Sequence, residues 1–207
     1  MKIISTNIGR IREVEWRGRK ITTGIFKESV DEPLFLGKRG VNRDEVADLK
    51  VHGGSDKACY LYSADHYEYW KSQFPDASWK WGIFGENLTV KRLDEGKIKI
   101  GDTYRVGTAV IQVSQPRLPC YKLGIRFGNA GIVKKFLNAP FPGVYTRVVD
   151  EGYVRTGDKM HLVKENREGM TVREVYSLFS SQKDNTALRN IACEQEFLAE
   201  SIKKDLR

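Results

Sequence analysis

The 207-residue sequence predicts a mainly β domain with a few helices, followed by a small α-helical segment. Short apolar segments that alternate with polar residues recur along residues 1–163, and glycines separate them, which is typical of many short strands. This pattern favours a closed or partly closed β-barrel. After Lys164 the apolar residues recur with helical spacing instead, and this predicts the helical segment.

Three stretches carry the strand pattern most clearly. Residues 57–63 (KACYLYS) alternate and are rich in aromatic side chains. Residues 97–115 divide at Gly101 and Gly107, as consecutive hairpins do. Residues 143–163 repeat the order of strand, glycine turn and strand. We therefore expect strands in all three stretches.

Two helices are expected between these strands. Ser63 is placed to cap a helix over residues 64–73, which Pro75 ends. A second helix is expected over residues 131–139, where Pro140 stops it.

The C-terminal region begins with a polar linker over residues 165–170. Thr171 and Glu174 then have the spacing of a capping box at the start of a helix. Further apolar stripes predict two or three short amphipathic helices, which are too small to fold alone and should pack on the β domain or on a partner. The predicted domains are therefore residues 1–163 and 164–207.

The composition is that of a cytoplasmic globular protein. No apolar run approaches the ~18 residues of a membrane span, and the N-terminus lacks the apolar stretch of a signal peptide. Three scattered cysteines do not form a disulfide framework, which fits a reducing compartment.

The basic excess lies in one part of the chain. Residues 1–163 carry 27 basic and 19 acidic residues, whereas residues 164–207 carry eight of each. A generally basic surface and a site for an anion such as a small phosphorylated ligand both explain this excess. No nucleic-acid-binding signature is present, and we expect neither nucleic acid nor membrane as a partner.

Two glycine-containing motifs could contact a ligand. His52, Gly53 and Gly54 precede Lys57, and paired glycines leave backbone N–H groups open to an oxyanion. Asn87, in the sequence FGENLTV, can both donate and accept hydrogen bonds. Taken alone, each motif is better explained by a plain turn.

A third motif, QPRLPCYKL, surrounds Cys120. Its two prolines stiffen the loop, and Arg117 and Lys122 would lower the pKa of the Cys120 thiol if they lie near it. The residues leave open a nucleophile, a soft metal ligand, a redox thiol and a buried structural cysteine. A pair of this thiol with His52, His66 or His161 is possible, but spacing selects none of them.

Several other sites are not indicated. The sequence contains neither GxGxxG nor GxxxxGK[ST], which are the nucleotide-binding signatures. It also lacks CxxC pairs, so the cysteines do not have zinc-finger or iron–sulfur spacing.

Together the segments HGGSDKACYLYSADHYEYW, FGENLT, IKIGDTYRVGTAVIQVSQPRLPCYKL and GVYTRVVDEGYVRTGD resemble, in this order, the MOSC domain of molybdenum cofactor sulfurases. More narrowly, the chain resembles the stand-alone bacterial YiiM-like subgroup over residues 1–163. The tail is similar to the three-helix domain that follows MOSC in this subgroup.

The resemblance implies a MOSC-type β-barrel that binds molybdenum cofactor, a molybdopterin whose dithiolene holds the metal. It implies that Cys120 is the protein thiolate on molybdenum and therefore the catalytic and metal-binding residue. Candidates to surround the pterin phosphate are Lys57, Arg117, Lys122 and Arg147. Candidate hydrogen-bond partners of the cofactor are His52, Gly53, Gly54 and Asn87.

The resemblance also implies an activity: a molybdenum-dependent oxidoreductase that reduces N-hydroxylated compounds such as 6-N-hydroxylaminopurine, a toxic base analogue. An external electron-donor protein would be required, and the helical tail is one candidate surface for its docking. The alternative is a non-enzymatic cofactor or sulfur carrier that takes sulfur on Cys120 as a persulfide.

Overall fold

The computed structural model describes residues 1–48 and 53–207. Its main feature is an eight-stranded sheet in the order β13-β9-β10-β11-β7-β8-β1-β4. In chain order these strands are β1 (Lys2–Gly9), β4 (Lys27–Val30), β7 (Cys59–Ser63), β8 (Leu88–Lys91), β9 (Thr103–Val106), β10 (Ala109–Pro116), β11 (Val144–Asp150) and β13 (Met160–Lys164). The mainly β class is confirmed, and each of the three stretches contains strands. The strand expected over residues 97–100 is wrong, because these residues form a turn with only an isolated bridge between Lys99 and Thr171.

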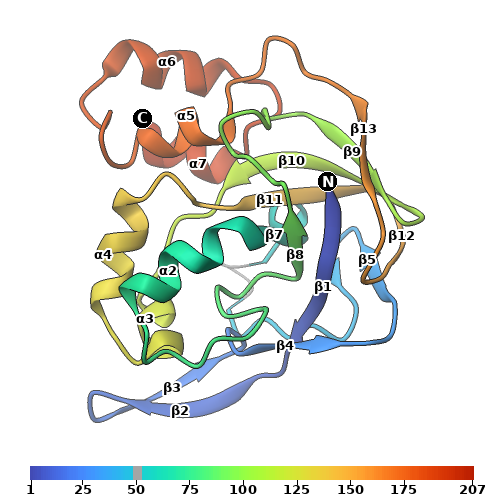
Figure 1. The fold of residues 1–207 in the computed structure, drawn as a ribbon. Helices are drawn as coiled ribbons and strands as arrows, with labels where there is room; N and C mark the ends of the chain where they lie inside the picture. The colour runs from blue at the N-terminus through green and yellow to red at the C-terminus, as the bar shows by residue number, and fades with distance from the viewer. Residues whose placement is uncertain (49–52) are drawn as a thin grey trace.

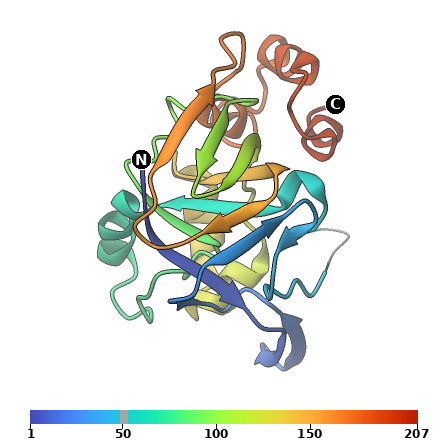
Figure 2. The same cartoon turned by 90° about the vertical axis from the view of Figure 1, so that its right-hand side faces the viewer.

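Two smaller sheets extend this framework. Strands β2 (Arg12–Trp16) and β3 (Arg19–Thr23) form a hairpin that projects from the body of the molecule (Figure 1). Strands β5 (Leu34–Gly37) and β6 (Gly40–Val41) form a second hairpin, and β12 (Gly152–Val154) pairs with its first strand. Figure 2 shows the main sheet curving, with the helices gathered outside it.

The sequence pattern favoured a closed or partly closed β-barrel, and a closed barrel is not found in the part of the chain that the structure describes. Over the described residues, the two ends of the main sheet, β13 and β4, are not joined by a ladder. One isolated bridge between Lys2 and Lys159 links the start of β1 to the residue before β13. The expectation was too strong because alternation identifies strands and their buried faces but carries no information on which edges meet.

Two apolar clusters fill the interior. The larger is mostly aliphatic and joins the sheet to the C-terminal helices. The second is aromatic, and its fully buried members include Tyr62, Trp70 and Phe84. Stacked rings hold it together, with the centroids of Tyr62 and Phe84 4.2 Å apart.

The helices near this aromatic cluster are α2 (Tyr67–Gln73), α3 (Tyr121–Phe127) and α4 (Gly131–Asn138). Short 3₁₀ turns precede β7 (Ser55–Lys57) and α2 (Ala64–His66). The two predicted helices are confirmed, but the proposed cap is wrong. The Ser63 hydroxyl makes no capping hydrogen bond, and the Asp65 carboxylate accepts from the backbone N–H of Arg92 at 2.8 Å instead.

The C-terminal region forms three helices, α5 (Val172–Ser177), α6 (Thr186–Glu194) and α7 (Glu200–Leu206), as predicted. The capping box is present, since the Thr171 side chain accepts from the Glu174 N–H and the Glu174 side chain accepts from the Thr171 N–H. Tail residues such as Val172 and Ile202 share the core cluster of the sheet. The boundary between residues 163 and 164 stays a prediction. Among the described residues, no helix is long and apolar enough to cross a membrane.

Candidate functional site

A cavity of about 800 Å³ opens beside the end of β10, a volume within the ~300–1,000 Å³ range of small-molecule sites. Segments that are distant in the sequence meet around it: the base of the β2–β3 hairpin, the β5–β6 hairpin, the turn before β7, and the loop between β10 and α3. Six of the predicted site residues line it, namely Gly53, Lys57, Asn87, Arg117, Lys122 and Cys120.

Cys120 sits where the stiff loop ends and α3 begins. Pro116 is the last residue of β10, and Cys120 is the residue immediately before α3, with extended backbone angles of φ −122° and ψ 169°. Its carbonyl accepts from the Leu123 N–H at 3.0 Å, which anchors the residue to the first turn of the helix. Its side chain is half-buried at the cavity wall. The thiol is thus held at one position and faces a space that a ligand could fill.

Arg117 is a buried cation in this wall, only 6% exposed. Its guanidinium carbon lies 5.2 Å from the ring centres of both Tyr60 and Phe136. Its Nη1 atom is buried and has no hydrogen-bond partner among the described residues. A buried donor without an acceptor is costly, and the described residues supply no acceptor for this atom.

Burial disfavours the charge of Arg117, but Tyr60, Tyr145 and Cys120 counteract it and the pKa of Arg117 stays above its ordinary value. Conversely, burial raises the pKa of Tyr145 while Arg117 opposes the rise. Arg117 therefore remains a permanent cation with neutral tyrosines around it.

Asn87 is held in a polar network that the sequence did not reveal. Its Nδ2 donates to Asp44 Oδ2 at 2.9 Å, and its Oδ1 accepts from the Tyr60 N–H at 3.2 Å. Asp44 also accepts from the Gly9 N–H at 2.7 Å and from Lys27 Nζ at 2.5 Å. Asn87 thus lines the cavity while its amide groups bind neighbouring protein atoms, and a contact with the cofactor stays a prediction.

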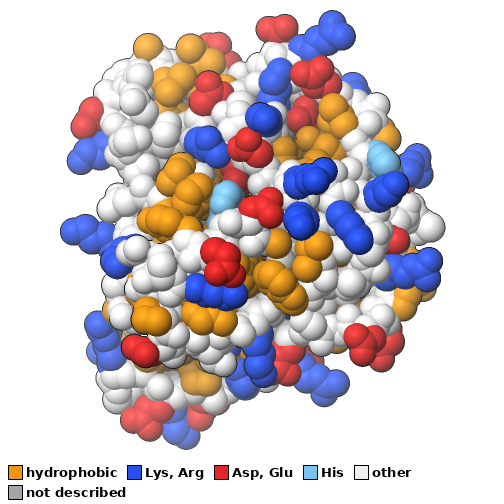
Figure 3. Space-filling view, viewed as in Figure 1, with side chains coloured by type: hydrophobic (Ala, Val, Ile, Leu, Met, Phe, Trp, Pro, Cys, Tyr) orange, Lys and Arg blue, Asp and Glu red, His pale blue; other side chains and the backbone are white. Residues whose placement is uncertain are grey.

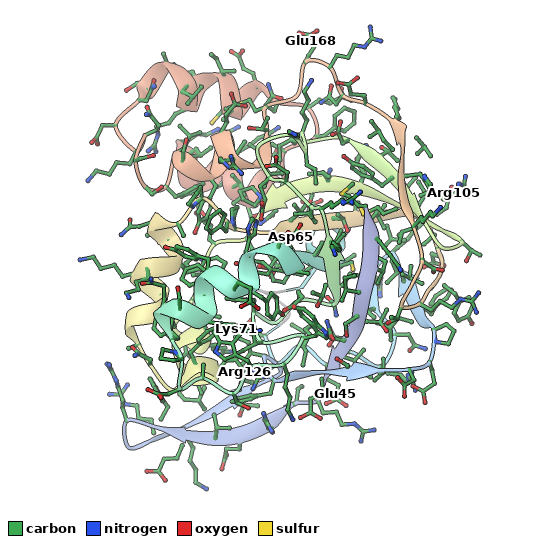
Figure 4. All side chains as sticks on the ribbon, viewed as in Figure 1. Glu45, Asp65, Lys71, Arg105, Arg126 and Glu168 are labelled. Atoms are coloured by element: carbon green, nitrogen blue, oxygen red, sulfur yellow. The ribbon has the colours of Figure 1, made fainter. Side chains whose placement is uncertain are left out.

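Lys27 and Asp44 line the cavity as a mostly buried ion pair, their side chains 10% and 5% exposed. Nothing local distinguishes either residue in the sequence, because their pairing depends on the hairpin base meeting the segment after β6. Glu45 beside them donates its backbone N–H to the Gly9 carbonyl at 2.9 Å, at the lower end of β1 (Figure 4).

The glycine motif is only partly visible, since His52 lies outside the described residues. Gly53 lines the cavity. Gly54 is not among the lining residues, and its φ of +96° allows its carbonyl to accept from the Lys57 N–H at 3.0 Å. Burial lowers the pKa of Lys57, and Asp205 and Asp56 counteract the change. The motif thus brings a half-buried ammonium group to the cavity wall.

Arg147 is not brought to the cavity. Its Nε donates to Asp56 Oδ1 at 2.5 Å and its Nη1 to the Phe197 carbonyl at 2.9 Å. His66 and His161 are also elsewhere: His66 Nε2 pairs with Glu95 at 2.9 Å, and His161 is exposed on β13. Neither histidine lies at the cavity with Cys120.

The lining is basic. Among the described residues, seven lysine or arginine side chains and three carboxylates line the cavity. Lys38, Arg39 and Arg43, from the β5–β6 hairpin and just beyond it, were not predicted. Further basic side chains gather over β1 and β8 on the face shown in Figure 3, so the cavity holds only part of the positive charge of the chain.

The cavity presents one soft metal-binding group. No cluster of three or more His, Cys, Asp or Glu residues able to hold a metal ion occurs in residues 1–48 and 53–207. Cys59 is fully buried, and burial raises the pKa of its thiol to about 12. Cys193 lies in the tail, where its Sγ contacts the Lys203 carbonyl. Cys120 is therefore the cysteine placed to meet a ligand.

The sequence is similar to a known domain family and to known proteins. The family model described as "MOSC domain" matches residues 48–161. The chain is 38% identical to "Protein YiiM" of Escherichia coli (strain K12) over 158 residues, 75% of this chain and 70% of that protein. It is 33% identical to a protein named "Reductase" of Gibberella moniliformis over 165 residues, 78% of this chain and 29% of that protein.

A solved structure is also similar to this one over almost the whole chain. The crystal structure of YiiM from Geobacillus stearothermophilus superposes with a TM-score of 0.83 at 29% identity, over 99% of this chain and 96% of that one. The likeness includes the C-terminal helices, since almost the whole of both chains is covered.

Proposed function

Because the chain belongs to the MOSC domain family and is YiiM-like within it, we propose that it is a molybdenum-cofactor-binding reductase of N-hydroxylated compounds, with Cys120 as the protein ligand to molybdenum. The observation that carries the proposal is that Cys120, a thiol, and Arg117, a buried cation with an unsatisfied guanidinium donor, line the same cavity. The fungal relative named "Reductase" supports an oxidoreductase over a carrier.

The cavity suits the chemistry of a molybdopterin. The metal of such a cofactor is soft and accepts thiolate ligands, and Cys120 offers a thiol at the cavity wall. The terminal phosphate needs cations and N–H donors, and Arg117, Lys57 and Lys122 line the same space. In this proposal Arg117 Nη1 gains the acceptor that the protein does not provide, which offsets the cost of its burial.

The chain's residues would bind and orient, while the redox step belongs to the cofactor. When bound, the cofactor supplies the two-electron chemistry by which R–NHOH, two electrons and two protons give R–NH₂ and water. Cys120 would ligate the metal from the stiff loop, and Arg117 would fix the anionic end of the pterin. The electrons come from outside the chain, so an external electron-transfer protein is part of the proposal.

The same proposal includes a cytoplasmic location and a two-part organisation, with the β domain in residues 1–163 and the helical segment in 164–207. Both rest on the sequence patterns.

Turnover tests the proposed function. Protein purified from a host that makes molybdenum cofactor is reduced with dithionite and given 6-N-hydroxylaminopurine, and adenine formation is measured. We expect turnover by the wild type and by Cys193→Ala, whose thiol lies in the tail, and none above background by Cys120→Ala. A cofactor-loaded wild type that forms no adenine, yet accepts sulfur on Cys120, would instead establish the carrier.

A further inference from the structure

The C-terminal helices are connected to the cavity through hydrogen bonds with two of the segments that form its wall: the turn before β7 and the end of β10. The first connection is Arg147, on β11. Its guanidinium bridges Asp56, in the turn before β7, and the carbonyl of Phe197, between α6 and α7. Asp56 immediately precedes Lys57, which lines the cavity. One side chain thus ties the tail to the glycine-containing wall.

The second connection involves the strand that leads to Cys120. The Ala199 N–H donates to the Ser114 carbonyl at 3.1 Å, and Ser201 Oγ donates to Gln115 Oε1 at 3.3 Å. Ser114 and Gln115 are the residues before Pro116, where β10 ends and the stiff loop begins. The tail therefore holds the strand at the point from which Arg117 and Cys120 are placed. Figure 1 shows α5 and α7 beside this end of β10.

The two wall segments are also linked to each other at this place. Ser114 Oγ donates to the Asp56 carbonyl at 2.5 Å and lies 2.9 Å from the Tyr145 carbonyl. A change in the tail would therefore act on both segments together. Asp205, on α7, adds an attractive charge for Lys57, since it opposes the lowering of the Lys57 pKa by burial.

We propose that residues 197–205, here called the C-terminal brace, position the cavity wall for cofactor binding and that Arg147 is the positioning residue that couples them to it. Arg147 then acts through Asp56 and Lys57 and makes no contact with the cofactor. That the bound ligand is molybdenum cofactor rests on the proposed function, whereas the positioning of the cavity wall by the brace does not depend on it.

The side-chain chemistry at Arg147 suits such a coupling. A guanidinium presents several N–H donors in a planar fork, so it can serve a carboxylate and a carbonyl at once. A lysine presents a single point charge and cannot reproduce both contacts in the same geometry. The Arg147 and Asp56 side chains are 25% and 33% exposed, so the pair is only partly screened by water.

The test uses the full chain and compares Arg147→Met with Arg173→Met. Arg173 provides a matched control because it also links the tail to the β domain, through Asp94 at 3.0 Å, but contacts neither wall segment. Amide hydrogen exchange of residues 53–58 and 114–118 is measured in cofactor-free protein. Molybdenum and pterin content is then measured in protein from a cofactor-producing host.

We expect Arg147→Met to speed exchange in both segments about tenfold, the effect of losing about 1.4 kcal/mol of local stabilisation. Pterin content should fall about as much, with a melting temperature close to that of Arg173→Met. Arg147→Lys should lie between Arg147→Met and the wild type. If Arg147→Met does not fold, Ser201→Ala tests the brace without changing a charge, because it removes only the hydrogen bond to Gln115. We expect Ser201→Ala to speed amide exchange in residues 114–118.

Equal exchange in Arg147→Met and Arg173→Met, or an unchanged rate in 114–118 for Ser201→Ala, would overturn the brace. Full pterin retention by Arg147→Met would overturn its role in cofactor binding. A wild type that holds no pterin would contradict the proposed function, while the exchange data would still decide whether the tail braces the wall.

Discussion

Replacing Arg117 by methionine should lower the affinity for an anionic ligand, whereas its effects on the stability of the protein oppose each other. The substitution removes a buried donor without a partner, Nη1, whose burial costs about 1–3 kcal/mol. It also removes two contacts over aromatic rings at 5.2 Å, each contributing about 0.5–2 kcal/mol. These effects oppose each other, so the free energy of unfolding should change by no more than about 3 kcal/mol.

The effect on an anionic ligand has no such compensation. A hydrogen bond from a charged donor is worth about 1.5–3 kcal/mol, so affinity for the pterin phosphate should fall roughly 10- to 150-fold. Urea denaturation gives the stability, and the fluorescent oxidation product of the pterin, measured after dialysis, gives the retained cofactor.

Arg126→Met is the matched control. Arg126, on α3 (Figure 4), also has a buried guanidinium nitrogen without a partner and lies 5.2 Å from the centre of the Phe26 ring, but it does not line the cavity. The control should keep its pterin. Equal retention by both variants would refute the assignment of Arg117 as an anion contact. A loss of more than about 4 kcal/mol of stability in Arg117→Met would show that it is a core structural residue.

Three further outcomes follow from buried groups and tight backbone positions. Burial raises the pKa of Glu86 above its ordinary 4.5, so the folded state holds this proton more tightly than the unfolded state. The contribution of this group to the free energy of unfolding is therefore complete below the unfolded-state pKa and is lost as pH rises through the folded-state pKa. Urea denaturation at stepped pH measures this dependence, and Glu86→Gln should remove it. Because burial raises the pKa of Cys59 to about 12, only about one in 10⁴ of its thiols is ionised at pH 8. Native protein treated with iodoacetamide should therefore carry no adduct at Cys59 by mass spectrometry, and rapid labelling there would contradict its burial. Gly143→Ala should lower the stability measured by thermal denaturation by several kcal/mol more than Gly128→Ala does. Both glycines have positive φ, but only at Gly143 would an added Cβ meet backbone, 2.6 Å from the Leu61 carbonyl oxygen. Equal losses of stability would show that the backbone at Gly143 shifts to make room.

Local signals made much of the fold predictable. The capping box at Thr171 and Glu174 involves residues three apart, so its hydrogen bonds depend little on the remainder of the chain. Alternation likewise located β9 and β10, although it also predicted a strand over residues 97–100, which form a turn. Ser63 shows the limit of such signals. It has the right propensity and precedes a helix, but its hydroxyl makes no capping hydrogen bond, while Asp65 binds the backbone N–H of the distant Arg92.

Long-range placement explains most of what the sequence did not predict at the site. Tyr145 and Arg147 lie two residues apart on β11 and therefore on the same face of the strand. Only Tyr145 reaches the cavity, because Arg147 lies two pairs further along the ladder with β10, opposite Gln112 and near the tail. The alternation along a strand predicts which face of the sheet a side chain lies on. It does not predict which other segments of the chain lie next to that side chain. The same reason hides the pairing of Lys27 with Asp44, which needs the start of β4 to meet the segment after β6.

The most direct test of the central claim is the cofactor content of wild type, Cys120→Ala and Cys193→Ala, purified from a host that makes molybdenum cofactor. Molybdenum is measured by mass spectrometry and pterin by the fluorescence of its oxidation product. We predict that the wild type and Cys193→Ala hold both, whereas Cys120→Ala loses molybdenum. A wild type with neither molybdenum nor pterin, or a Cys120→Ala variant with full content of both, would contradict Cys120 as the ligand that holds the cofactor.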